Sequence, residues 1–271
     1  MYSAGSFTFF CYEFNSFGKK YKTGDFTPVD VLNAVLFFLV CAGGSAVQAV
    51  CGFGFVSFVM MFFPYIFPSY QMSVVVAGIL AAISGTFMAF RLRRDIKWKR
   101  ILAPVGAYFV ISAVVILFSS YQPDIIMIRL LAVSLILLSV YFMFIGSRLK
   151  TRPTVANGII AGSLGGLLGG FFSVSGPPVA LYMVSASEDN NIYMANIQGY
   201  FAMTGIYSVG MRVVAKTVTT ASLGWAAFGV AAVLAGIFIG RKIFYKLNPE
   251  WLRRSVYIVM AVSGITMLFK K

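Results

Sequence analysis

A short turn rich in serine and proline is the most chemically suggestive feature of this sequence. It reads Ser-Val-Ser-Gly-Pro-Pro and covers residues 173–178. Two adjacent prolines end any helix before them and suit the first turn of a helix after them, so a new half-helix is predicted to begin near Gly176. Its first backbone N–H groups lack helical partners and carry partial positive charge. Together with the hydroxyls of Ser173 and Ser175, they predict a binding site for an anion.

Other polar residues and glycines are candidates to line the same site. Small residues spaced by four, such as Gly166 and Gly170, are equally typical of close helix packing in membranes. Asn196 and Gln198 do not share a helix face, so at least one of them has a hydrogen bond to a neighbouring helix as its alternative role. Arg212 ends an apolar run, where we expect it to reach the lipid headgroups, with attraction of anions at a pathway mouth as the alternative. The predicted substrate-binding residues are Gln48, Gly52, Gly54, Ser57, Gly170, Ser173, Ser175, Gly176, Pro177, Asn196, Gln198 and Arg212.

The composition shows what must position these residues. Of 271 residues, 59% are hydrophobic and 11% are charged, whereas a soluble domain has about 45–50% apolar and about 25% charged residues. A transmembrane helix needs about 20 mostly apolar residues. The sequence therefore predicts an all-α polytopic membrane protein. Its clearest apolar runs are Val74–Phe90, Ile101–Phe118, Leu130–Ile145, Ala221–Ile239 and Val256–Phe269.

The net charge of +14 does not indicate a nucleic-acid partner. The Lys and Arg residues lie at the ends of the apolar runs, as the positive-inside rule expects. Residues 1–30 are aromatic and have neither the early basic region nor the continuous apolar stretch of a signal peptide, so we predict an interfacial or loose tail. The three cysteines have no metal spacing, and neither a disulfide framework nor a metal or other cofactor is expected.

Several features recur along the chain and indicate an internal duplication. Gly52–Phe53 is matched by Gly170–Phe171, and Ser84-Gly85-Thr86 before Arg91 is matched by Thr204-Gly205-Ile206 before Arg212. Pro-Asp at 123–124 and Pro-Glu at 249–250 each precede an apolar run. We therefore predict an N-terminal segment 1–30, a first repeat 31–150 and a second repeat 151–271. Each repeat is expected to hold a glycine-rich segment followed by three transmembrane helices.

The charges of the loops predict that the two repeats are inverted. In the first repeat the loop 91–100 holds six Lys or Arg residues, and the next loop, 119–124, holds none. In the second repeat the equivalent first loop holds only Arg212 and Lys216, and the next basic group is Arg241, Lys242, Lys246, Arg253 and Arg254. The basic loop has changed place, which is what inverted repeats under one positive-inside rule require.

Two topologies are compatible with that pattern. In the favoured one, each glycine-rich segment, 30–67 and 151–187, is a hairpin of two half-helices, which gives six full spans and places both termini outside. In the alternative, each segment is one full span, which gives eight spans but leaves the cations of 241–254 outside. Irregular backbone at membrane depth survives only where protein or water satisfies it, so the hairpin topology places the candidate site at the two helix breaks.

The chain resembles the TauE/SafE family of sulfite and organosulfonate exporters. The resemblance covers about residues 31–269 and rests on the two glycine-rich segments, the turn Ser175–Pro178 and the Gly236–Gly240 run with its basic flank. It implies two inverted repeats and transport of small sulfur-containing or organic anions. We expect a multi-pass protein of a bacterial-type inner (cell) membrane that uses alternating access, whose partners are a small anionic substrate and lipid.

The residues that are absent argue against other functions. The sequence has no His, and its eight acids lie in the tail or near span ends. Intramembrane enzymes generally use a His, a Ser–His pair or paired carboxylates, so no enzyme is expected. Proton-coupled pumps generally need an ionisable relay in the membrane, which favours a uniporter or facilitator. The alternative function is a non-transporting membrane scaffold or assembly factor, which explains the spans but not the two matched breaks.

Overall fold

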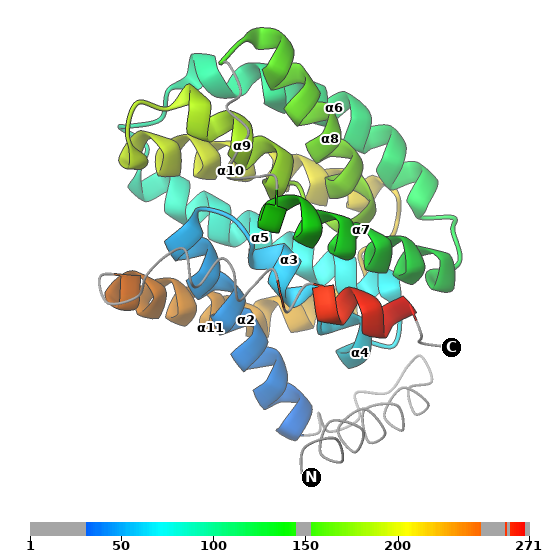
Figure 1. The fold of residues 1–271 in the computed structure, drawn as a ribbon. Helices are drawn as coiled ribbons and strands as arrows, with labels where there is room; N and C mark the ends of the chain where they lie inside the picture. The colour runs from blue at the N-terminus through cyan, green and yellow to red at the C-terminus, as the bar shows by residue number, and fades with distance from the viewer. Residues whose placement is uncertain (1–30, 145–152, 245–257, 259–260, 269–271) are drawn as a thin grey trace.

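The protein is helical throughout the part that its structure, a computed structural model, describes: residues 31–144, 153–244, 258 and 261–268. Within these residues there is no strand, and residues 261–268 are helical too. The helices, labelled as in Figure 1, are α2 Val31–Cys51, α3 Phe55–Val59, α4 Phe63–Ile66, α5 Tyr70–Arg91, α6 Trp98–Ser119, α7 Asp124–Phe144, α8 Val155–Phe172, α9 Gly176–Ala186, α10 Asn190–Val214 and α11 Thr220–Phe244. The predicted N-terminal segment 1–30 lies outside the described residues.

Six of these helices are long and apolar enough to cross a membrane. They are Leu32–Cys51, Tyr70–Arg91, Trp98–Ser119, Asp124–Tyr141, Val155–Phe172 and Thr220–Gly240. The predicted apolar runs in α5, α6 and α11 are confirmed, and the run 130–145 overlaps α7. Of the run 256–269, residues 258 and 261–268 are described, and they are helical.

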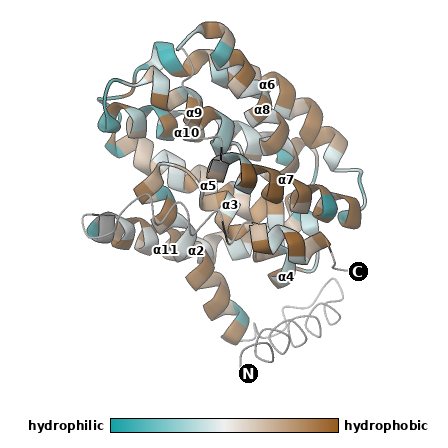
Figure 2. Ribbon diagram, in the orientation of Figure 1, coloured by the Kyte–Doolittle hydropathy of each residue, from teal (hydrophilic) through white to brown (hydrophobic). Residues whose placement is uncertain are grey.

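The helices expose large apolar side chains on their outer faces. Val110 of α6 is 68% exposed, Leu137 of α7 is 63% exposed and Ile160 of α8 is 58% exposed. Figure 2 shows hydrophobic residues along α2, α6 and α7, with hydrophilic residues mainly at helix ends and loops. Such a surface is stable only against lipid. The protein is therefore an integral membrane protein.

The two glycine-rich segments do not form pairs of half-helices. The prediction is wrong for the first helix of each segment, which is a long helix and not a half-helix. The helix α2 has 21 residues and α8 has 18, so both are of membrane length. The helices that follow them in each segment are short: α3 and α4 have five and four residues, and α9 has eleven. The glycines inside the long helices do not break them, because packing in a membrane outweighs the low helix propensity of glycine.

These glycines instead bring the helices into close contact. A Cβ on Gly170 of α8 would lie 2.6 Å from Val115 of α6, and a Cβ on Gly162 would collide with Pro104. On the other side of the molecule, a Cβ on Gly240 of α11 would lie 2.7 Å from Cα of Ala46 in α2. Only glycine permits backbones to approach this closely, so α8 packs tightly on α6 and α11 packs tightly on α2.

The helices α5 and α10 pack against each other and run in opposite directions. A Cβ on Gly85 of α5 would lie 2.9 Å from Phe201 of α10, and a Cβ on Gly205 of α10 would lie 2.8 Å from Ala82. Residue numbers therefore rise along one helix as they fall along the other. In the α2–α11 and α6–α8 pairs, by contrast, residue numbers rise together. Both of the breaks that follow α2 and α8 contact this pair of helices: Gln198 of α10 bonds Gly52, and Ser173 bonds Val74 of α5.

Candidate functional site

The first helix break, which we call the first turn, covers Gly52–Phe55 between α2 and α3. Gly52 has φ 83° and Gly54 has φ 109°, in the left-handed region that glycine tolerates and other residues rarely adopt. Two side chains of α10 cap the end of α2: the Tyr193 hydroxyl donates to the carbonyl of Cys51 at 3.2 Å, and Nε2 of Gln198 donates to that of Gly52 at 2.8 Å. The first turn is thus held by neutral groups.

The second helix break, the second turn, covers Ser173–Gly176 between α8 and α9. Ser173 is in the left-handed region at φ 59°, a conformation that costs a non-glycine residue about 1–2 kcal/mol. Its hydroxyl donates to the carbonyl of Val74 at 3.2 Å and accepts from Nη2 of Arg212 at 3.3 Å. These two contacts offset the strain, and they tie the second turn to both α5 and α10.

The backbone of the second turn has free donors. In the described part of the chain, the N–H groups of Val174, Ser175 and Gly176 donate to no backbone carbonyl. Proline occupies the next two positions and has no N–H, so these three N–H groups are the ones that α9 and its turn leave to a ligand. The sequence prediction of a helix beginning at Gly176 is confirmed, with fewer free helical N–H groups than expected because Pro177 and Pro178 supply none.

A pocket lies where the two turns meet. A Cβ on Gly176 would lie 3.1 Å from Cβ of Phe53, so the turns are in contact beside it. The volume of the pocket is about 50 Å³, measured as the space open to the centres of water molecules. One water needs roughly 10–15 Å³ of such space, so the pocket fits a few waters or one small oxyanion. The lining residues are Gln48, Gly54, Phe55, Val56, Ser57, Gly78, Ala81, Tyr108, Ser173, Val174, Ser175, Gly176, Phe201, Thr204, Gly205 and Ser208.

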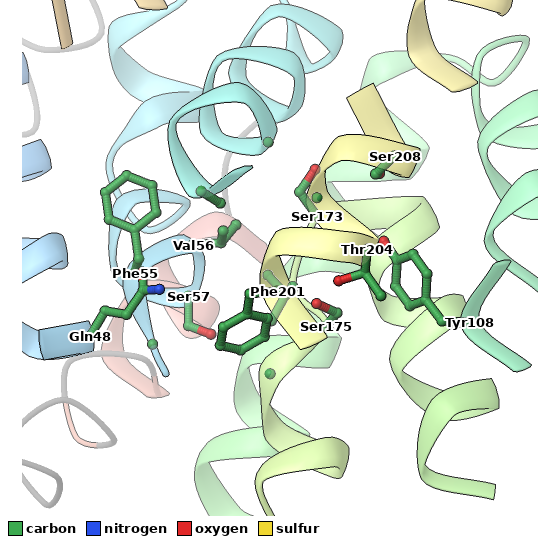
Figure 3. A pocket seen from close by; sticks show the side chains of 16 residues that line it. Gln48, Phe55, Val56, Ser57, Tyr108, Ser173, Ser175, Phe201, Thr204 and Ser208 are labelled. Atoms are coloured by element: carbon green, nitrogen blue, oxygen red, sulfur yellow. The ribbon is translucent and has the colours of Figure 1, made fainter. Parts of the chain in front are cut away.

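The lining side chains form two groups on opposite sides of the pocket. Figure 3 shows Gln48, Phe55 and Ser57 on the side of the first turn, and the hydroxyl-bearing residues of the second turn, α6 and α10 opposite them. The ring of Phe201 lies between the groups. Most of the hydroxyls and the free N–H groups lie on one wall, and the other wall has Phe55 beside the polar side chains of Gln48 and Ser57. Such a pocket is suited to a small anion with oxygen atoms.

Half of the predicted site residues line this pocket. They are Gln48, Gly54, Ser57, Ser173, Ser175 and Gly176. Pro177 lies in the first turn of α9, and the carbonyls of Gly52 and Gly170 accept hydrogen bonds from Gln198 and Arg212.

Gln198 lies behind the first turn and not in the pocket wall. Its Oε1 accepts from Nε2 of Gln48 at 3.0 Å, and its own amide N–H donates to Gly52. Oε1 of Gln48 in turn accepts from the hydroxyl of Ser84. The network is fully buried, and it fixes the side chain of Gln48 and the backbone of the first turn.

Asn196 of α10 does not line the pocket and contacts the residue that precedes α6. Its Oδ1 accepts from the backbone N–H of Lys97 at 2.8 Å, and its Nδ2 donates to the hydroxyl of Ser187 at 3.2 Å. Asn196 therefore links the α5–α6 loop to the α9–α10 loop. Asn196 and Gln198 thus both form hydrogen bonds to neighbouring segments, which was the alternative role predicted for at least one of them.

Arg212 does not reach the lipid headgroups, and that prediction is wrong. Its side chain is 2% exposed, and its Nη2 donates to the carbonyl of Gly170 at 3.0 Å. The guanidinium lies between α5 and α8: a Cβ on Gly78 of α5 would be 3.9 Å from its Nε, and α8 supplies the carbonyl of Gly170. Arg212 lies next to the pocket wall formed by Gly78 and Ser173.

Ten of the sixteen lining residues were not among the predicted site residues. Of these, Tyr108, Phe201 and Ser208 come from the middle of long helices, where a single aromatic ring or serine is ordinarily packing. A usable signal existed in α10, because Thr204, Ser208 and Arg212 are spaced by four and so share one helix face. No cluster of metal-ligating side chains occurs among the described residues.

Comparison with known proteins identifies the family. The family model described as Sulfite exporter TauE/SafE matches residues 36–267. The chain belongs to the TauE/SafE family. It is thus a member of a family of membrane transporters, described as sulfite exporters, and its six long apolar helices agree with that membership. No curated protein and no solved structure matches it.

Proposed function

We propose that this TauE/SafE protein exports a small anion, sulfite or an organosulfonate or a related sulfur-containing or organic anion, by alternating access. The observation that carries the proposal is the pocket between the two turns, whose second turn presents free backbone N–H groups and serine hydroxyls. Such donors bind oxyanions without needing a residue that changes its protonation. The pocket volume supports a substrate with few non-hydrogen atoms.

The pairing of the helices supports inverted repeats. If residues 31–150 and 151–271 are repeats, α2 corresponds to α8, α5 to α10 and α6 to α11. The helix α2 packs on α11 as α8 packs on α6, and in both pairs residue numbers rise together. The helices α5 and α10 pack on each other in opposite directions. A two-fold axis in the membrane plane generates this exchange of partners.

One detail of the duplication differs from the sequence match. The helices α2 and α8 end at Cys51 and Phe172, which are 121 residues apart. If α2 and α8 are equivalent, Gly52 has the same place after its helix as Ser173, three residues beyond the Gly170 that the sequence pairs with it. The glycine pairs of the two segments resemble each other in sequence, but they lie at different heights in their helices.

The loop charges support a sidedness for the transporter. With loop 91–100 on the cytoplasmic side of an inner membrane, the end of α5 and the start of α10 face inward, since Lys97 contacts Asn196. The start of α7 and the end of α10 then face outward. An inside-negative potential drives an anion out by about 2.3 kcal/mol per charge per 100 mV, so no proton coupling is needed for export.

Transport into proteoliposomes tests the proposal. The full-length protein is reconstituted, and uptake of radiolabelled sulfite, sulfoacetate and acetate is measured with and without an imposed membrane potential. Gly176→Leu fills the pocket, because even a Cβ there would lie 3.1 Å from Phe53 and 3.2 Å from Phe201. We expect potential-driven uptake of a sulfur anion by the wild type and a loss of at least about 100-fold in Gly176→Leu.

The matched control is Gly106→Leu, since a Cβ at Gly106 has nothing within 4 Å. It adds the same side chain on the exposed face of α6 and should leave uptake unchanged. Uptake that survives Gly176→Leu would remove the pocket from the pathway. Absence of flux for every anion under every gradient would favour the scaffold function, and a proton gradient that alone concentrates substrate would refute the uncoupled mechanism.

A further inference from the structure

A group of polar side chains surrounds Arg212 at one edge of the pocket, and two of its members, Tyr108 and Ser208, also line the pocket. Arg212 shares its face of α10 with Ser208 and Thr204, which line the pocket. Gly78 separates pocket and guanidinium, since a Cβ there would lie 3.0 Å from Oγ of Ser173 and 3.9 Å from Nε of Arg212. The backbone of Arg212 is one helical turn further along α10 than Ser208, and its guanidinium contacts the pocket residue Ser173.

Several buried donors in this group have no satisfactory partner. Nε of Arg212 and the hydroxyls of Ser112 and Ser208 are buried without a hydrogen bond of good geometry. Both hydroxyls lie beside the phenol of Tyr108, which also interacts with the charge of Arg212. That phenol lies over α8, because a Cβ on Gly169 would be 2.7 Å from it. The unsatisfied donors thus gather around one phenol, between α6, α8 and α10.

The charge of Arg212 has no counter-ion in the described part of the chain. The contacts of its Nη2 are a carbonyl and a hydroxyl, and the nearby carboxylate of Asp124 accepts from the backbone of Tyr70 instead. A buried charge without a partner is strongly unfavourable, and a buried polar group left unsatisfied costs about 1–3 kcal/mol. An anion that binds here would remove both penalties at once.

The equivalent arginine of the other half shows that the fold does not require this burial. Arg91 ends α5 as Arg212 lies in the last turn of α10. Arg91 is exposed, and its guanidinium lies over the rings of Phe87 and Phe238 at 4.7 and 5.1 Å from their centroids. Burial of the cation is therefore a property of one end of the molecule only.

We infer that Arg212, Ser112, Ser208 and Tyr108 form a second binding station for a small oxyanion, on the side of the pocket toward the end of α10. The free Nε–H of Arg212 donates to one oxygen of the ligand, and the serine hydroxyls donate to others. A guanidinium favours oxyanions over spherical anions because its donors match two oxygens. Under the proposed function and its sidedness, this station would lie on the outward side of the pocket, where an exported anion leaves. That role rests on the proposed function, whereas binding of an oxyanion at the station does not.

Thermal unfolding of the full-length protein in detergent tests the station without any transport. The protein is kept in gluconate, and sulfite is added under anaerobic conditions, with chloride as a comparison. A ligand that binds only the folded state raises Tm in a concentration-dependent way. We expect sulfite to raise the Tm of the wild type by several degrees and chloride to raise it less.

Variants assign the effect to Arg212. Arg212→Gln should lose the sulfite-dependent rise of Tm, with the apparent Kd raised at least about 10-fold, and its Tm without anion should not fall below that of the wild type. Arg212→Lys should retain a weaker rise, and Ser112→Ala should weaken binding without a change of charge. Arg91→Gln removes the same charge from the equivalent helix end and should respond to sulfite as the wild type does.

Gly176→Leu separates the station from the pocket. It should abolish flux while the Tm rise with sulfite persists, because the station shares Tyr108 and Ser208 with the pocket but does not include Gly176. A Tm rise lost in Gly176→Leu but kept in Arg212→Gln would place the only anion site in the pocket and overturn the station. So would a wild-type Tm that sulfite does not change, which would mean that buried water alone satisfies these donors.

Discussion

The two turns that meet at the pocket have the same place in their halves but opposite chemistry. The first turn, Gly52–Phe55, has glycine and phenylalanine only, is capped by the neutral amide of Gln198, and leads into a helix of five residues. The second turn, Ser173–Gly176, has two hydroxyls, is capped by the cation of Arg212, and leads into a helix of eleven residues. The difference indicates that, under the proposed function, the second turn supplies the donors for the anion and the first turn encloses it.

The largest effect is expected at the support of the first turn. Gln198→Leu would leave Nε2 of Gln48 and the carbonyl of Gly52 without partners, at about 1–3 kcal/mol for each group left unsatisfied. We expect a marked fall of the unfolding temperature in detergent and a weakened first turn. Asn191→Leu changes an exposed amide on the same helix and should have little effect. An equal fall in both variants would show that the network does not brace the turn.

Substitutions to and from glycine at the two left-handed positions, Gly52 and Ser173, should change stability by different amounts. Gly52→Ala places a Cβ at φ 83° and 3.0 Å from Tyr193 and Met194, which should destabilise the protein by about 1–2 kcal/mol or more. Ser173→Gly relieves the left-handed strain but loses two hydroxyl contacts, so its net change of stability should be small. Unfolding midpoints compare the two. A destabilisation by Ser173→Gly as large as that by Gly52→Ala would contradict the strain argument.

The smallest effects are expected for single hydroxyls. Ser175→Ala removes a donor from the second turn, and the loss of one hydrogen bond, about 0.5–1.5 kcal/mol, should raise the KM for the transported anion roughly 2–10-fold. Ser57→Ala makes the same change beyond the first turn and should raise KM less. Initial rates of uptake into proteoliposomes measure both. A larger rise for Ser57→Ala would reverse the assignment of the anion to the second turn.

The parts of the fold that depend on composition alone were predictable. The runs in α5, α6 and α11 have the length and apolarity that a bilayer requires, and Pro177 with Pro178 mark the start of α9 whatever surrounds them. The glycine-rich helices were not predictable in the same way. Glycine lowers helix propensity locally, and only the neighbours of Gly162 and Gly170, on another helix, show that these glycines serve contact.

The site was predictable as far as its backbone turn and not beyond it. Ser175 and Gly176 line the pocket because the turn itself forms it. The surroundings of Arg212 come from α5, α6 and α8, which no local pattern brings together, so its burial was missed. Asn196 and Gln198 were recognised as polar residues inside the membrane, but their partners, Lys97 and Gly52, are set by tertiary packing.

The helix α10 has a consequence for how the protein enters its membrane. It has 25 residues, yet it is not among the helices apolar enough to cross a bilayer alone. Its buried Asn196, Gln198 and Arg212 would each be costly to transfer into lipid singly. We therefore expect α10 to leave the translocation machinery only when α5 and α8 are already in the membrane to receive it, so that the second half depends on the first during biogenesis.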